Sequence, residues 1–185
     1  MKKLVFVAVL VLFLPLIAGA QEAYPKAEVF GGYSYFRLDD PVSLIDLNLH
    51  GWNASVSGNV NNWLGIVGDF SGHYGGPEAF GIGVPFLDVN THSFMVGPRL
   101  SYRSERVTPF AHFLIGATRG STGLFGVSFS RNALSGAIGG GLDLRVSRNF
   151  AVRVIQADYL MTRFFDERQN NMRLSAGIVF LLGNR

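Results

Sequence analysis

The strongest constraint on the fold of this chain is an alternation of apolar and polar side chains with a period of two residues. In residues 64–74 the large apolar side chains, such as Phe70, share one parity, and the charged ones, such as Asp69, share the other. Residues 172–182 repeat the pattern, again with every charge on one face. Successive side chains of a β-strand point to opposite faces, so this period predicts strands with one apolar and one polar side.

Six further segments follow the same alternation, and all eight have the length of a tilted strand that crosses a bilayer. These six are residues 27–37, 48–60, 92–102, 108–118, 133–145 and 151–163. The last one is irregular, because Arg153 and Asp158 have opposite parity and one of them would face lipid in a regular strand. A β-bulge near Gln156 would bring both charges to the same face, and we predict one there.

The connections between these segments alternate in length. Short turns are expected at 61–63, 103–107 and 146–150, and longer loops at 38–47, 75–91, 119–132 and 164–171. Barrels of the outer membrane have short periplasmic turns and longer external loops, and an even strand number places both termini in the periplasm. Unpaired strand edges are costly in hydrocarbon. The prediction is therefore an all-β, closed, antiparallel up-and-down transmembrane β-barrel of about eight strands.

Residues 1–20 have the organisation of a cleaved export signal. Lys2 and Lys3 precede an apolar run, and small residues at Ala18 and Ala20 suit a signal peptidase that cuts after Ala20. We therefore expect residues 1–20 to be removed and residues 21–185 to form a single barrel domain in the outer membrane.

Charge and cysteine content exclude several classes of function. Without residues 1–20 the chain has 14 basic and 13 acidic residues, a net charge of +1, so a nucleic-acid partner is not expected. The absence of cysteine excludes disulfides and thiolate metal sites. No spacing of His, Asp and Glu suggests a metal site, and no cofactor motif is present, so we expect neither.

The C-terminal strand carries the most specific motif. Residues 175–182 read Ser-Ala-Gly-Ile-Val-Phe-Leu-Leu, a polar residue followed by glycine and then spaced hydrophobic residues. With this motif the chain resembles the small outer-membrane β-barrel family of the OmpA and OmpX type. The resemblance implies that Gly177, Phe180 and Leu182 engage the barrel-assembly machinery, and that outer-membrane lipid surrounds the barrel. The family usually ends at the aromatic residue, whereas three more residues follow Leu182 here.

Several charged residues fall on the face that would line the barrel interior. Isolated buried charges are very costly, so these residues are expected to pair in a structural polar network. A gated, narrow ion path is the alternative, although a barrel of this size is normally filled by its own side chains. The predicted members of the network are Glu28, Asp69, Arg99, Asp143, Arg145 and Arg173.

Some small outer-membrane barrels are enzymes that modify lipid A, and the histidines bear on that alternative. His92 and Ser93 are adjacent, so their side chains point to opposite faces of a strand. His73 shares a face with Asp69, but no serine is clearly placed to complete a triad. We therefore predict no catalytic residues and a non-enzymatic protein.

Two external segments are apolar where loops are usually polar. They are residues 79–87 and 124–129, with Phe80, Phe86 and Phe125 as their largest side chains. They could extend the barrel wall or cover its mouth, or they could form a contact site for an extracellular partner.

The preferred interpretation is an outer-membrane barrel with a structural, adhesion-like or narrow-channel role. The main alternative is a soluble, secreted, lipocalin-like barrel, whose apolar side chains would face an internal ligand cavity. Both folds alternate with period two, so the directions of the Phe70 and Phe180 side chains distinguish them. The scarcity of lysine, 3 in the whole chain, favours the membrane protein.

Overall fold

The computed structural model describes residues 24–39, 45–75, 78–79, 82–83, 87–124, 127–164 and 167–184. These residues form strands joined by turns, and every strand pairing is antiparallel. In the described part of the chain, no helix is long and apolar enough to cross a membrane.

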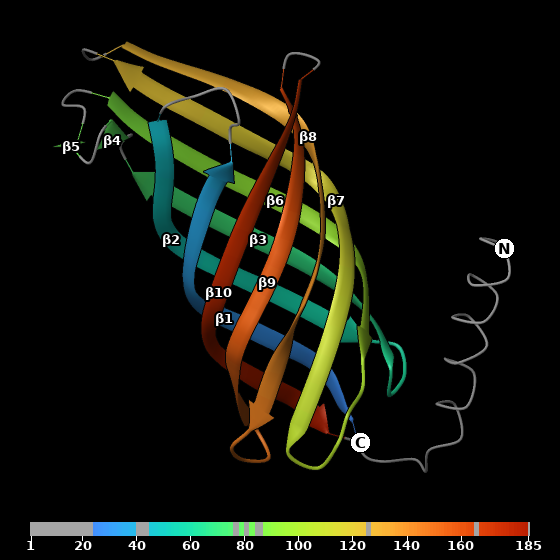
Figure 1. The fold of residues 1–185 in the computed structure, drawn as a ribbon. Coiled ribbons are helices and arrows are strands. Elements are labelled where there is room, and N and C mark those ends of the chain that lie inside the picture. Colours follow the sequence, from blue (N-terminus) through green and yellow to red (C-terminus); the bar gives the residue numbers. More distant parts are fainter. Residues whose placement is uncertain are drawn as a thin grey trace, which may run out of the picture.

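Eight long strands make the wall of a barrel (Figure 1). Each wall strand pairs with its neighbours in chain order, and β1 pairs with both β2 and β10, which closes the sheet. Two short strands, β4 and β5, form a small hairpin beside β2 at one end. The predicted closed barrel of eight strands is confirmed. The strands are β1 Pro25–Asp39, β2 Ile45–Asn59, β3 Leu64–Gly75, β4 Glu78–Ala79, β5 Ile82–Gly83, β6 Leu87–Ser101, β7 Val107–Leu124, β8 Val127–Arg145, β9 Phe150–Phe164 and β10 Glu167–Asn184.

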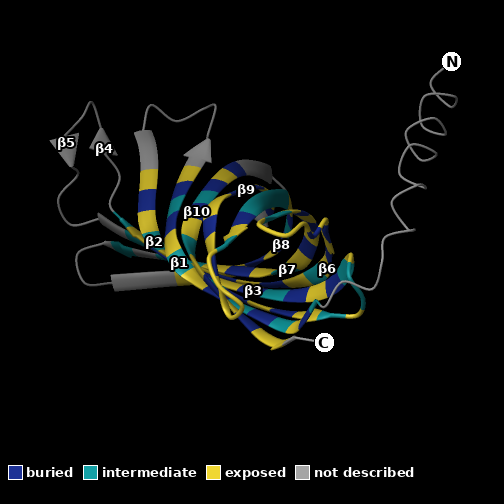
Figure 2. Cartoon of the chain, turned by 90° about the horizontal axis from the view of Figure 1, so that it is seen from below, coloured by how far each residue is buried: buried dark blue, intermediate teal, exposed yellow. Residues whose placement is uncertain are grey.

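Burial alternates along the wall strands, as the banding in Figure 2 shows. The exposed positions are mostly large hydrophobic residues, whereas polar and charged residues outnumber hydrophobic ones among the buried positions. Phe70 and Phe180 both point outward, with 42% and 44% of their surface exposed. The barrel is therefore apolar outside and polar inside. The lipocalin-like alternative, which needs the opposite arrangement, is wrong.

Strand β9 contains the predicted bulge. In its pairing with β8, Ile155 lies opposite Leu142 and Arg153 lies opposite Asp143, so Val154 is an extra residue. Val154 and Ile155 are consequently both exposed on the outer wall. This extra residue lets Arg153 and Asp158, which have opposite parity, both point into the interior.

The predicted long loop over residues 119–132 is wrong. β7 and β8 remain paired up to Leu124 and Val127, so most of this segment belongs to these two long wall strands. The physical reason is that a strand extending beyond the lipid meets water on its outer face. Its apolar alternation then ends before its hydrogen-bonded ladder does.

The barrel has two different ends. Short turns at 60–63, 102–106 and 146–149 lie at the same end as Pro25 and Asn184, the paired ends of β1 and β10. Short turns are typical of the periplasmic side of outer-membrane barrels, so we assign this end to the periplasm. The opposite end carries β4, β5 and the tops of β7 and β8, and is the external end.

Candidate functional site

The barrel interior contains two linked clusters of charged side chains. The lower cluster, near the periplasmic end, is built on two carboxylates. Glu28 accepts bonds from Arg99 Nη1 at 2.9 Å and from Arg103 Nη2 at 2.6 Å. Asp143 accepts bonds from Arg99 Nη2 at 3.0 Å and from Arg153 Nε at 2.8 Å. Arg99 therefore joins β1 to β8 across the lumen.

The upper cluster is centred on Arg173, which is completely buried. Its Nη1 donates to Asp69 Oδ1 at 2.7 Å, and its Nη2 donates to Asp158 Oδ2 at 2.7 Å. His112 Nε2 lies 2.7 Å from the other oxygen of Asp158. Gln156 links the two clusters, because it accepts a bond from Arg153 at 2.7 Å and donates to Asp158 at 2.8 Å.

Five of the six predicted interior residues are buried members of these clusters, and Arg145 differs. Arg145 is only half-buried and makes no ion pair with a described residue. Arg103, His112 and Gln156 were not predicted. Arg103 lies in a turn, outside any alternating segment, and a neutral residue such as Gln156 carries no charge signal in the sequence.

One cluster of buried hydrophobic side chains forms an apolar layer inside the barrel. Phe36, Leu49, Met95, Leu114 and Leu160 are each at most 5% exposed and pack together in it. They come from five different wall strands, and Val67 and Ala137 complete the cluster. Such a layer fills the interior of a small barrel with side chains.

The two histidines weighed as catalytic candidates, His73 and His92, are not paired with an accessible serine in the structure. His73 Nε2 lies 2.8 Å from Ser34 Oγ on β1. The sequence did not predict that Ser34 would lie beside His73. Both residues are at most 1% exposed, so a substrate has no access to this pair. His92 is exposed on the outer wall and Ser93 is buried in the interior, as their adjacency predicts. In the described part of the chain, no group of three or more His, Asp or Glu residues could hold a metal ion.

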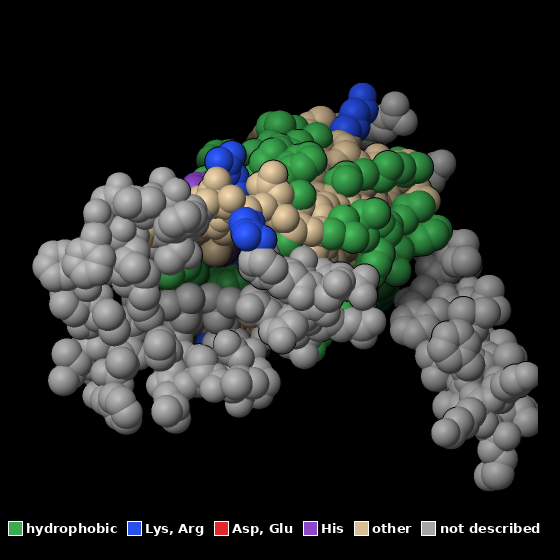
Figure 3. Space-filling model, turned by 90° about the horizontal axis from the view of Figure 1, so that it is seen from above, with side chains coloured by type: hydrophobic (Ala, Val, Ile, Leu, Met, Phe, Trp, Pro, Cys, Tyr) green, Lys and Arg blue, Asp and Glu red, His purple; other side chains and the backbone are tan. Residues whose placement is uncertain are grey.

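The outer wall carries a broad belt of hydrophobic side chains (Figure 3). Aromatic residues with polar groups border this belt on the external side. Tyr35 Oη donates to Asn48 Oδ1 at 2.7 Å, and Tyr74 Oη lies 3.0 Å from His92 Nε2. Aromatic residues with a polar tip are typical of the level at which a membrane meets water.

The motif on β10 lies at the seam that closes the barrel. Phe180 and Leu182 point outward, with 44% and 48% exposure. Gly177 pairs with Gly32 of β1, and a Cβ at Gly177 would overlap the carbonyl oxygen of Gly31. The seam therefore needs glycine at this position, and engagement of the assembly machinery by these residues stays a prediction.

Other predicted residues lie outside the part of the chain that the structure describes. These are the cleavage-site residues Ala18 and Ala20 and the loop residues Phe80, Phe86 and Phe125.

A closed antiparallel barrel with an apolar outer belt and a charged, side-chain-filled interior is a transmembrane β-barrel of the outer membrane. Comparison with known proteins agrees with that class. Residues 5–181 match the model of the outer membrane protein beta-barrel domain, and the chain belongs to that family.

The chain is similar to two attachment invasion locus proteins, and it shares its fold with a third protein. It is 28% identical over 184 residues to the attachment invasion locus protein of Yersinia pseudotuberculosis serotype I, covering 97% of this chain and 98% of that protein. The crystal structure of the attachment invasion locus protein of Yersinia pestis matches with a TM-score of 0.59 and 25% identity, covering 85% of this chain and 99% of that one. Neisserial surface protein A shares the fold, with a TM-score of 0.69 and 14% identity over 85% of this chain and 97% of that one.

Proposed function

We propose that this protein is a non-enzymatic attachment protein, whose external end contacts an acidic glycan on another surface. The observation that carries the proposal is the full-length likeness to attachment invasion locus proteins. A structure of the Yersinia pestis protein is a complex with sucrose octasulfate, a heparin analogue, and that chain is 25% identical to this one with a TM-score of 0.58.

The external end of this chain offers the chemistry that a sulfated ligand needs. Arg37 near the end of β1, Arg119 on β7 and Arg131 on β8 are all exposed there. Arginine presents a planar set of donors that suits sulfate and carboxylate oxygens. The filled interior, with its apolar layer, favours attachment over the narrow-channel role.

Adhesion of cells that display the protein to a heparin-coated surface tests this proposal. Replacing Arg37, Arg119 and Arg131 together with Gln should reduce adhesion at least tenfold and remove most of its salt dependence. The matched control is Arg106→Gln with Arg148→Gln, two exposed positions in the periplasmic turns, which should leave adhesion unchanged. Unchanged adhesion of the triple variant, at equal surface abundance, would contradict the proposal.

The apolar external segments offer a second route to attachment. Replacing Phe80, Phe86 and Phe125 with Ser separates the two routes, because it removes apolar contact area and leaves the arginines in place. Loss of adhesion in this variant alone would assign the contact to residues 79–87 and 124–129, and it would contradict an acidic glycan as the main ligand.

A further inference from the structure

The lower part of the barrel interior holds more positive than negative charge. Four arginines and two carboxylates line this region, an excess of two positive charges (4 − 2 = +2). They are Arg99, Arg103, Arg145 and Arg153 against Glu28 and Asp143. One of these two positive charges is offset by the upper cluster, where Asp69 and Asp158 face a single arginine, and the other belongs to Arg145, which is half-buried at the periplasmic end. The lower part of the interior therefore presents a positive potential toward the periplasm.

All four oxygens of the two carboxylates pair with three of the four arginines. Glu28 Oε2 accepts from Arg99, and Glu28 Oε1 accepts from Arg103 and from Asn59. Both oxygens of Asp143 accept from Arg153, and Oδ2 also accepts from Arg99. In addition, the buried Nε of Arg99 has no acceptor within the described residues. Donors therefore outnumber acceptors around these two carboxylates.

Aromatic rings compensate two of the arginines but not the other two. The guanidinium carbon of Arg99 lies 4.1 Å from the centre of the Phe110 ring. The guanidinium carbon of Arg153 lies 4.2 Å from the centre of the Phe30 ring and 4.3 Å from that of Phe110. Such cation–π contacts stabilise positive charge at a buried site. No ring contact of this kind is found for Arg103 or Arg145 within the described residues.

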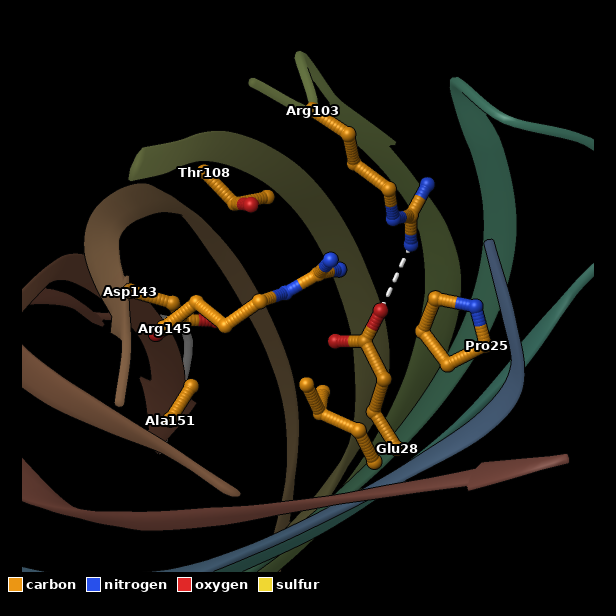
Figure 4. Close-up of a pocket in the computed structure, with 8 residues that line it drawn as sticks. Pro25, Glu28, Arg103, Thr108, Asp143, Arg145 and Ala151 are labelled. Atoms are coloured by element: carbon orange, nitrogen blue, oxygen red, sulfur yellow. Dashed lines mark hydrogen bonds and ion pairs between the residues drawn. The ribbon is translucent and has the colours of Figure 1, made fainter. Parts of the chain in front are cut away.

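Arg103 and Arg145 line a recess at the periplasmic end of the barrel (Figure 4). Arg103 enters from the turn between β6 and β7, and Arg145 enters from the last position of β8. Arg103 bonds to Glu28, whereas Arg145 makes no ion pair with a described residue. Thr108 adds a hydroxyl group to the same recess. The recess has room for about one water-sized group.

We propose that this recess is a binding site for one small monovalent anion, a halide or a single carboxylate group, held by Arg145 and Arg103 with Thr108 as a further donor. The excess of guanidinium donors supplies the affinity, and the recess has room for one compact group. The site faces the periplasm, at the end opposite the attachment surface proposed above, so the two proposals can fail independently.

The test uses the full-length folded barrel in detergent micelles, with chloride as the first probe. Chloride is titrated at constant ionic strength against isethionate, a bulkier monovalent anion without a carboxylate group, and the excess line width of the chloride-35 NMR signal is measured. The wild-type protein should show saturable broadening, and formate should displace chloride from the same site. Broadening that does not saturate, or that formate does not reduce, would overturn the proposal.

Variants locate the binding. Arg145→Gln should weaken chloride binding at least tenfold, while Arg145→Lys, which keeps the charge, should retain most of it. Arg148→Gln, in the exposed turn three residues away, is the matched control and should bind like the wild type. Equal binding by the Arg145→Gln and wild-type proteins would overturn the assignment. If Arg145→Gln does not fold, Thr108→Val serves in its place, with a smaller but measurable weakening expected.

Discussion

Replacement of Arg173 by Met is expected to destabilise the barrel strongly. Arg173 is 0% exposed and donates two bonds to Asp158, at 2.9 and 2.7 Å, and one to Asp69, at 2.7 Å. Met has a similar length and no charge, so the substitution leaves two buried carboxylates without their arginine. Removal of one partner from a buried ion pair costs about 3–5 kcal/mol. Asn53 and His112 still bond to the two carboxylates, which favours the lower part of that range.

Reversible urea unfolding of the barrel in lipid vesicles, followed by tryptophan fluorescence, measures this loss. With a denaturant dependence of about 2 kcal/mol per molar urea, the midpoint should fall by roughly 1.5–2.5 M. Arg148→Met, at an exposed turn position, should change the free energy of unfolding by less than about 0.5 kcal/mol.

A compensated variant separates lost charge pairing from lost packing. Combining Arg173→Met with Asp69→Asn and Asp158→Asn removes the uncompensated negative charges, so much of the stability should return. The reasoning is refuted if Arg173→Met alone costs less than about 1 kcal/mol, or if the triple variant is no more stable than the single one.

Two further substitutions and one deletion test the wall of the barrel. Gly32→Val at the closing seam should abolish heat-modifiable migration in gels, because a Cβ there would overlap a carbonyl oxygen of β10; Gly31→Ala, where a Cβ meets nothing, should migrate normally. Phe113→Arg on the outer belt should lower the free energy of unfolding in vesicles by about 2–4 kcal/mol, whereas Val146→Arg in the exposed periplasmic turn should change it by less than 0.5 kcal/mol. Deletion of Val154 removes the extra residue and leaves a regular strand in which Arg153 and Asp158 still share the interior face, so a folded barrel should be recovered in refolding assays; failure to fold would show that the bulge itself is required.

The sequence was sufficient for the strand pattern and the barrel, because alternation is a local property. In each wall strand, the alternation of apolar and polar residues shows which side chains face lipid and which face the interior. Even the bulge was detectable, since Arg153 and Asp158 cannot share a face in a regular strand. The limits of β7 and β8 were not detectable, because the alternation fades where a strand leaves the lipid while its hydrogen bonds continue.

The partners inside the barrel were decided by tertiary structure alone. Arg173 meets Asp69 across 104 residues of sequence, and Glu28 meets Arg103 across 75. The tilt and stagger of the strands in a closed barrel determine which interior side chains lie at the same height along the barrel axis. A local sequence pattern contains no information on tilt or stagger. For the same reason the sequence identified Arg145 as an interior charge, but only the structure showed that the available carboxylates are already occupied by other arginines.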